Sequence, residues 1–139
     1  MESFRRGQRA VVCRSEDAGS AAPTCTAGAG NWGGWLVFVD VDRDGTFGAG
    51  DISLRATVVR APAVVVASPL IAAEQSRVVF RPDGLARRAN GALLAAQIRV
   101  CVATTQPPEN ARDVAISGGS RMGVRRFNAG GACAAPADV

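Results

Sequence analysis

The aspartates of DVDRDGTFGAGD, residues 40–51, have the spacing of a loop that binds a divalent cation. Asp occupies positions 1, 3, 5 and 12 of this stretch and Gly occupies position 6, as in calcium loops built from alternate side chains of a tight turn. The candidate ligands are Asp40, Asp42, Asp44 and Asp51. Because residues 34–40 and 52–60 have the pattern of strands, we expect a hairpin whose aspartates accept hydrogen bonds from turn amides and hold no metal. Calcium binding is the alternative.

Arginines near the C-terminus could bind an anion. Three of them stand in GGSRMGVRRF, residues 118–127, and a fourth lies shortly before it. The candidates are Arg121, Arg125, Arg126 and Arg112. A guanidinium group binds phosphate through two parallel hydrogen bonds, and the neighbouring glycines let the backbone approach a partner closely. If these side chains lie along one edge, they form a phosphate-binding patch; otherwise they form an ordinary solvated face.

The net charge of +4 is located in the second half of the chain. Residues 1–60 contain seven arginines and seven acids, whereas residues 61–139 contain nine arginines and five acids. This asymmetry is a mild indication of an anionic partner for the second half.

The composition argues against catalysis. The chain has no histidine, which removes the commonest general base and the usual partner of a serine or cysteine nucleophile. It also has no lysine, since all 16 basic residues are arginine. The acids cluster within residues 40–51 and otherwise occur singly, so no pair of carboxylates is placed for acid–base work. We expect neither an enzyme nor a cofactor.

The four cysteines predict two disulfides. They are Cys13, Cys25, Cys101 and Cys133. None forms a CxxC pair, and a zinc site without histidine would need all four. Four cysteines allow three pairings, of which the spacing favours Cys13–Cys25 and Cys101–Cys133. Disulfides indicate an oxidising compartment such as the periplasm or the cell exterior.

The sequence contains no export signal and no apolar stretch long enough to span a membrane. The longest such stretch, residues 61–73, is interrupted by Pro62 and Pro69. Because an oxidised domain must be exported, we expect the chain to be a piece of a longer protein whose N-terminus holds the signal. MESFRRG, residues 1–7, has the pattern of the last turn of a helix, with Gly7 just past its end.

One domain, residues 1–139, is expected from the length and from the apolar fraction of 47%. After the helix end, short β-type runs alternate with turns. The runs are residues 8–14, 34–40, 52–60, 63–67, 78–80, 93–103 and 112–117, with a last short strand within 118–131. Residues 135–139 are expected to fray. The pattern predicts an α+β, mostly β fold with a short N-terminal helix stub and two small antiparallel sheets packed together.

Six segments, in their order along the chain, support a family resemblance. They are RRGQRAVVCRS (5–15), NWGGWLVFVDVDRDG (31–45), GDISLRA (50–56), VVFRPDG (78–84), IRVCVA (98–103) and RDVAISGGSR (112–121). Together they resemble the FimT/GspH family of minor type IV pilins and type II secretion pseudopilins. The resemblance covers nearly the whole chain, and residues 31–56 are its most specific part.

The resemblance implies a pilin-like domain that follows a long apolar N-terminal helix, first a membrane anchor and later the core of a filament. It implies a minor pilin subunit that primes type IV pilus assembly near the filament tip, with other pilin subunits as partners. Such a subunit would lie in the inner membrane with a periplasmic domain, and then in the extracellular pilus. The alternatives are a type II secretion pseudopilin without DNA binding and a calcium-binding adhesion or scaffold module.

Some FimT-type members bind DNA during natural transformation through a C-terminal Gly-Arg-x-Arg motif, so double-stranded DNA is a further implied partner. The matching region here is GGSRMGVRRF. Ser120 stands before Arg121, and three residues separate Arg121 from Arg125, so the motif is approximate while the local density of arginine is kept. Two or three phosphate contacts would give weak, salt-sensitive and sequence-independent binding.

Overall fold

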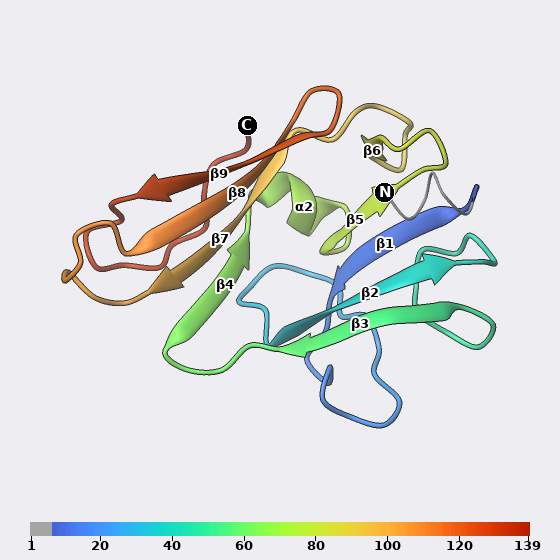
Figure 1. Cartoon of the computed structure of the whole chain (residues 1–139), viewed down its shortest axis with the longest axis horizontal. Helices are drawn as coiled ribbons and strands as arrows, with labels where there is room; N and C mark the ends of the chain where they lie inside the picture. Colours follow the sequence, from blue (N-terminus) through green and yellow to red (C-terminus); the bar gives the residue numbers. More distant parts are fainter. Residues whose placement is uncertain (1–6) are drawn as a thin grey trace.

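The computed structural model describes residues 7–139 as two antiparallel sheets and one short helix (Figure 1). The elements are β1 (Arg9–Arg14), β2 (Gly34–Asp40), β3 (Ile52–Val58), β4 (Ala63–Ala67), α2 (Pro69–Ala73), β5 (Arg77–Phe80), β6 (Ala86–Arg87), β7 (Ala96–Val102), β8 (Ala111–Ser117) and β9 (Arg121–Phe127). The predicted mostly β fold is confirmed. The expected helix end at residues 1–7 lies outside the described residues except for Gly7. Within residues 7–139, no helix has the length and apolar character needed to cross a membrane.

The first sheet has the strand order β3-β2-β1-β5-β6, and the second has the order β4-β7-β8-β9. All paired strands are antiparallel. β2 and β4 begin and end at the predicted residues, because each is an apolar run bounded by glycine, proline or aspartate. β7 begins at Ala96 rather than at residue 93, and β6, with two residues, is too short to be predicted.

The sequence does not predict helix α2, because Pro69 stands within its five residues. Proline is nevertheless suited to the first helical position, where its missing N–H would have no helical partner. Ser68 precedes it as the N-cap residue, and Ile71 is completely buried. Tertiary packing rather than helix propensity therefore stabilises α2, as is usual for helices this short.

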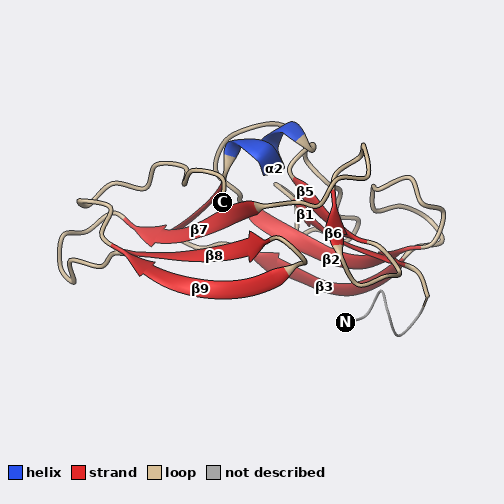
Figure 2. Ribbon diagram, turned by 90° about the horizontal axis from the view of Figure 1, so that it is seen from above, coloured by secondary structure: helices blue, strands red, loops and turns tan. Residues whose placement is uncertain are grey.

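A shared apolar core joins the two sheets beneath α2. It includes Ile71 from α2, Phe80 from β5, Val65 from β4, Ile116 from β8 and Trp32 from the loop before β2. The backbone N–H of Trp32 donates to the carbonyl oxygen of Val65 at 2.7 Å, which links this loop to the second sheet. Figure 2 shows α2 on one side of both sheets, above their junction. The two sheets are thus packed together, as predicted.

A second apolar cluster lies on the opposite face of the first sheet. Alternate residues of β1 face opposite sides, so that Ala10 belongs to the shared core and Val11 to this cluster. The loop between β2 and β3 covers part of it with Phe47, whose ring centroid lies 5.3 Å from that of Phe38. The acidic loop is therefore attached to the body of the domain through an aromatic side chain.

The C-terminal segment, residues 128–139, covers the face of the second sheet that points away from the shared core. The amide Nε2 of Gln97, on β7, donates to the carbonyl oxygen of Ala137 at 2.8 Å. The backbone N–H of Leu70 donates to the carboxylate of Asp138 at 3.0 Å. The expected fraying of residues 135–139 is therefore wrong, because hydrogen bonds to β7 and α2 hold this segment in place.

Both predicted disulfides are confirmed. Cys13–Cys25 joins β1 to the loop that follows it, and Cys101–Cys133 attaches the C-terminal segment to β7 across a sequence separation of 32 residues. A longer closed loop restricts the unfolded chain more strongly, so the second disulfide should contribute more to stability than the first.

Replacing Cys101 and Cys133 with serine should lower the free energy of unfolding by about 3–4 kcal/mol, since the unfolded chain regains the entropy of the opened loop. Urea denaturation followed by tryptophan fluorescence measures this change. Hydrogen exchange should accelerate through local opening in residues 128–139, whereas amides of β1 and β2 should accelerate only as far as the loss of global stability requires. A loss of less than about 1 kcal/mol would show that the cross-link does not hold the segment.

Candidate functional site

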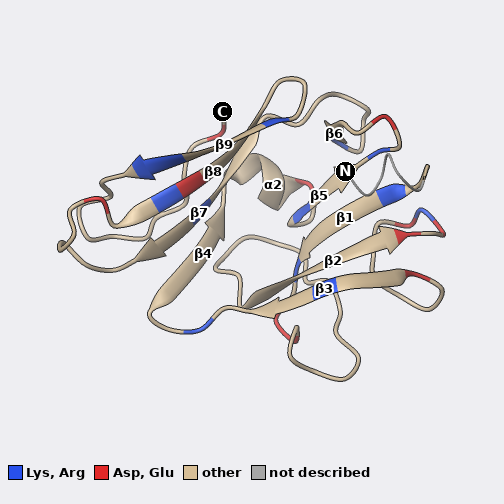
Figure 3. Cartoon of the chain, in the orientation of Figure 1, with Lys and Arg blue, Asp and Glu red and all other residues tan. Residues whose placement is uncertain are grey.

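The four candidate arginines lie on two adjacent strands at an edge of the second sheet. Arg112 is on β8, whereas Arg121, Arg125 and Arg126 are on β9. β9 is the last strand of its sheet, and all seven of its residues are exposed. Figure 3 shows basic residues on both strands with an acidic residue on β8 among them. The structure therefore brings the predicted residues to one edge.

The strand register divides these arginines between the two faces of the sheet. Arg112 lies opposite Arg126, and Asp113 lies opposite Arg125. Because successive side chains of a strand point to opposite faces, Arg112 and Arg126 share one face, while Arg121 and Arg125 share the other. An anion that contacts all four must therefore approach the outer edge of β9 rather than one face.

A buried ion pair lies next to Arg125. Arg99, on β7, donates through Nε and Nη2 to the two carboxylate oxygens of Asp113, on β8, at 2.7 and 2.9 Å. These residues are only 6% and 0% exposed, and the hydrogen bonds to Asp113 raise the pKa of Arg99 above its ordinary value. Nη2 of Arg125 is 3.7 Å from the same carboxylate. The ring of Phe127 lies against both guanidinium groups, 4.3 Å from that of Arg99 and 5.9 Å from that of Arg125.

Arg99 and Asp113 are not among the residues that the sequence predicts for this site. The available signal is weak: each is a charged residue within an otherwise largely apolar strand, in IRVCV and in RDVAI. They lie directly opposite each other on neighbouring strands. This pairing could be recognised from the sequence only if the register of β7 against β8 were already known.

On the face of β8 and β9 that carries Arg112 and Arg126, the polar contacts are more exposed than those of the Arg99–Asp113 pair. Nη1 of Arg112 donates to the carbonyl oxygens of Glu109 and Ala111, both at 3.1 Å. Nη1 of Arg126 is 3.9 Å from the carboxylate of Glu109, and these two side chains are 72% and 54% exposed. An ion pair that is so exposed contributes little to stability. Arg126 can therefore leave Glu109 and bind another anion with little loss of folding free energy.

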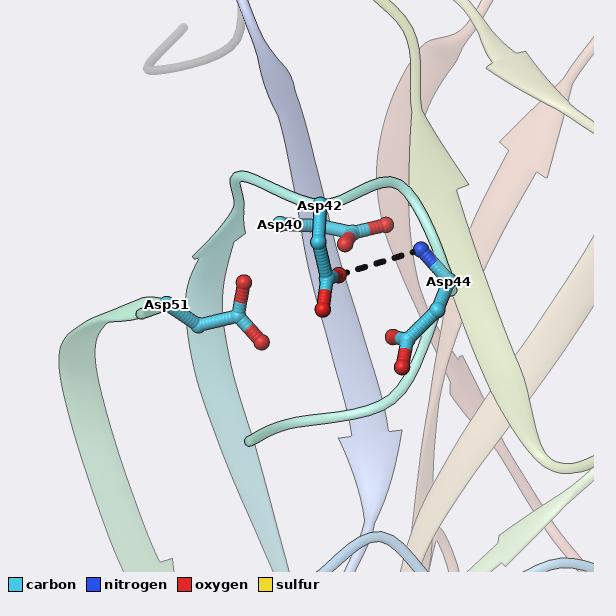
Figure 4. Close-up of side chains that lie close together, drawn as sticks. All are labelled: Asp40, Asp42, Asp44 and Asp51. Atoms are coloured by element: carbon cyan, nitrogen blue, oxygen red, sulfur yellow. Dashed lines mark hydrogen bonds between the residues drawn. The ribbon is translucent and has the colours of Figure 1, made fainter. Parts of the chain in front are cut away.

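The four candidate aspartates, in the loop between β2 and β3, also lie together (Figure 4). One carboxylate oxygen from each lies within 4.8 Å of those of the other three. Asp42 accepts a hydrogen bond from the backbone N–H of Asp44 at 3.2 Å. Asp51 accepts hydrogen bonds from the backbone N–H groups of Val41 and Gly48 at 2.8 and 3.0 Å. The predicted hairpin with aspartates that cap turn amides is confirmed.

Asp40 differs from the other three because it is buried, with 1% of its surface exposed. Its Oδ2 accepts a hydrogen bond from the N–H of Gly45 at 3.0 Å and lies 3.5 Å from Nε of Arg9. Burial raises the pKa of Asp40 above its ordinary value; Gly45 and Arg9 oppose this rise, whereas Asp42 and Asp51 add to it. The ionised form of Asp40 is therefore less favourable than that of an exposed aspartate.

Comparison with protein families gives one match, to the model described as type II transport protein GspH, over residues 1–120. The chain belongs to the GspH family. This confirms the resemblance found in the sequence and, at the level of the family, a pilin-like minor subunit. No curated protein and no solved structure matches the chain.

In this GspH-family protein the match ends one residue before β9 begins. The acidic loop and Arg112 lie within the matched residues. The three arginines of β9 and the C-terminal segment lie beyond it. The family assignment therefore rests on the first sheet, on α2 and on strands β4, β7 and β8 of the second sheet. It gives no information about the arginines of the edge strand.

Replacing Asp113 with alanine should lower the free energy of unfolding by about 3–5 kcal/mol, because Arg99 would keep a buried charge without its partner. Urea denaturation at neutral pH measures the change. Glu109→Ala removes the exposed partner of Arg126 and is the matched control, with an expected change within about 0.5 kcal/mol. Equal losses in the two variants would contradict this role of the Arg99–Asp113 pair.

Proposed function

We propose that this protein is a minor pilin of a type IV pilus, which primes filament assembly near the tip and contacts other pilin subunits. The observation that supports this role is the GspH family match over residues 1–120. Its two disulfides are stable in an oxidising compartment, which suits a periplasmic domain anchored at the inner membrane and later displayed on the extracellular pilus. The proposed role is structural and binding, not enzymatic.

The second part of the proposal is non-specific binding of double-stranded DNA along the edge of β9. The strand is fully exposed and contains three arginines, and Arg112 lies beside it. Arg121 and Arg125 are four residues apart, which corresponds to about 13 Å along a strand. They would therefore contact different phosphates of one DNA backbone. Contacts to phosphate alone do not distinguish one base sequence from another.

The acids near β9 leave its guanidinium groups accessible. Asp113 is completely buried and already forms two hydrogen bonds with Arg99. The side chain of Arg125, which lies 3.7 Å from this carboxylate, is still 65% exposed. The side chain of Arg126 is 72% exposed. The pair of Arg126 with Glu109 is exposed and therefore weak, and Asp113 keeps its hydrogen bonds with Arg99 if Arg125 moves away. A phosphate can therefore replace both contacts to the acids without a large loss of stability.

A type II secretion pseudopilin that does not bind DNA is the second candidate function. It is favoured by the description of the matching family as a type II transport protein. Both roles require the same domain and the same contacts with other subunits. They differ at β9, where the pseudopilin requires no anion-binding edge, so a measurement of DNA binding separates them.

Fluorescence anisotropy with a labelled duplex tests the DNA-binding role. The wild-type protein should bind at low salt, and its affinity should decrease as sodium chloride rises from about 20 to about 200 mM. The decrease should be about 60-fold for two phosphate contacts and about 500-fold for three, because each contact releases counterions from DNA. Arg121→Gln together with Arg125→Gln should reduce both the affinity and this salt dependence.

The matched control replaces Arg55 and Arg60 with glutamine. Both are exposed, and they lie on and just after β3 in the first sheet. This control removes the same charge without changing β9, so it should retain most of the binding. Absence of wild-type binding at low salt would exclude the DNA-binding role. Equal weakening of the two double variants would assign the binding to net charge rather than to the edge strand.

A further inference from the structure

We propose that the loop between β2 and β3 binds one calcium ion through the carboxylates of Asp40, Asp42, Asp44 and Asp51. The site does not depend on the DNA-binding role, because it lies in the first sheet and the arginines of β9 lie at the edge of the second. Its ligand class is a hard divalent cation with oxygen ligands.

The separation of the four carboxylates fits a single calcium ion. Calcium–oxygen distances are roughly 2.3–2.6 Å, so two ligands of one ion are at most about 5 Å apart. One oxygen of each aspartate lies within 4.8 Å of the other three, which satisfies this limit before any ion is added. Figure 4 shows the carboxylates of Asp42, Asp44 and Asp51 around a common space, with that of Asp40 adjoining it.

Asp40 supplies independent evidence for a ligand. The residue is 1% exposed, and its Oδ1 makes no hydrogen bond within the described part of the chain. Figure 4 shows one oxygen of this carboxylate turned toward Asp42. A buried carboxylate oxygen without a partner costs free energy, and the adjacent acids increase this cost by repulsion. A cation coordinated by this oxygen removes both unfavourable contributions.

The neighbouring arginines do not replace this cation. Nε of Arg9 is 3.5 Å from Oδ2 of Asp40, the oxygen that already accepts from Gly45. At this distance Nε makes no hydrogen bond, and Oδ1 of Asp40 also has no partner among residues 7–139. A second guanidinium nitrogen of Arg9 donates to the carbonyl oxygen of Arg43, and Nη1 of Arg77 donates to that of Gly45. Both arginines thus donate hydrogen bonds to backbone carbonyl oxygens of the loop and not to the unpaired oxygen of Asp40. Their charge lowers the expected affinity into the range of extracellular calcium modules, about 10⁻⁴–10⁻³ M.

The backbone of the loop already has the turn that such a site needs. Gly45 has a φ of +77°, and a Cβ at this position would lie 2.7 Å from Nη1 of Arg77. Glycine at position 6 of a calcium loop allows this sharp turn, and the residue at position 7 supplies a backbone carbonyl. Here that residue is Thr46. Together with the four carboxylates it would provide five ligands, which water completes.

Calcium bound here would stabilise the connection between β2 and the edge strand β3. Asp40 ends β2, and Asp51 precedes β3 by one residue. Phe47, between them, packs against Phe38 in the cluster beneath the loop. The ion would therefore hold together the ends of two strands and the aromatic side chain that covers the first sheet.

The test uses protein freed of metal with a chelator and then titrated with calcium chloride. Isothermal titration calorimetry should give one calcium per chain, and about 10 mM calcium should raise the Tm by about 5 °C, because the ion binds only the folded state. Magnesium, or sodium chloride at the same ionic strength, should raise the Tm by a smaller amount. Excess chelator should reverse the calcium effect.

Asp42→Ala together with Asp44→Ala should lower the calcium affinity at least tenfold. Asp83→Ala is the matched control, because Asp83 likewise accepts a hydrogen bond from the backbone two residues later, at 2.9 Å from the N–H of Leu85, but lies outside the cluster. This variant should keep the calcium response of the wild type. If the double variant does not fold, Asp42→Asn is used, since it retains an acceptor for the N–H of Asp44 while removing one charge.

Three results would overturn the proposal. The first is no heat of binding and no change of Tm in the wild type at about 10 mM calcium. The second is an equal rise of Tm with magnesium or with sodium chloride. The third is a calcium response in the folded variants of Asp42 that equals that of the wild type. None of these results bears on DNA binding, which is measured without calcium.

Discussion

The ion pair between Arg99 and Asp113 connects β7, β8, β9 and the C-terminal segment. Its two hydrogen bonds cross from β7 to β8. Nη1 of Arg99 also donates to the carbonyl oxygen of Ala134, in the C-terminal segment, at 3.2 Å. The ring of Phe127 on β9 lies 4.3 Å from the same guanidinium group. An unpaired charge at this depth is costly, and both the edge strand and the tail contact the guanidinium group of this pair.

Both faces of the first sheet are covered, although only 5% of the residues in the chain are aromatic. One face shares a core with α2 and the second sheet, and the other is covered by two loops. The disulfide Cys13–Cys25 fixes the first loop, whereas the second loop is held by Phe47 and by hydrogen bonds to its aspartates. These loops therefore contribute to the fold, and the hydrogen bonds within the acidic loop are part of that contribution.

The two candidate binding regions lie at opposite parts of the fold and use opposite charges. The arginines of β9 are exposed on the edge of one sheet, and the aspartates gather at the end of β2 in the other. An exposed edge strand also has free backbone groups, and its charged side chains discourage pairing with the edge of another sheet. The arginines of β9 therefore disfavour edge-to-edge association, whether or not they also bind the anion proposed above.

Short-range patterns in the sequence determined the strands, the disulfides and the family. Apolar runs between turn residues gave β2 and β4 their observed bounds, and the spacing of the aspartates predicted a loop in which all four meet. The cysteine spacing favoured the observed pairing. The strands and the acidic loop depend on residues close together in the chain, whose pattern a sequence displays directly.

Only the tertiary structure decided which side chains face each other. Register places Arg99 opposite Asp113 and divides the arginines of β8 and β9 between two faces. Burial leaves Oδ1 of Asp40 without a hydrogen-bond partner among the described residues. Packing of Ile71 in the shared core stabilises a helix that begins at Pro69. Each of these outcomes depends on contacts between distant residues, where a shift of one position reverses the face of every side chain. No local pattern contains that information.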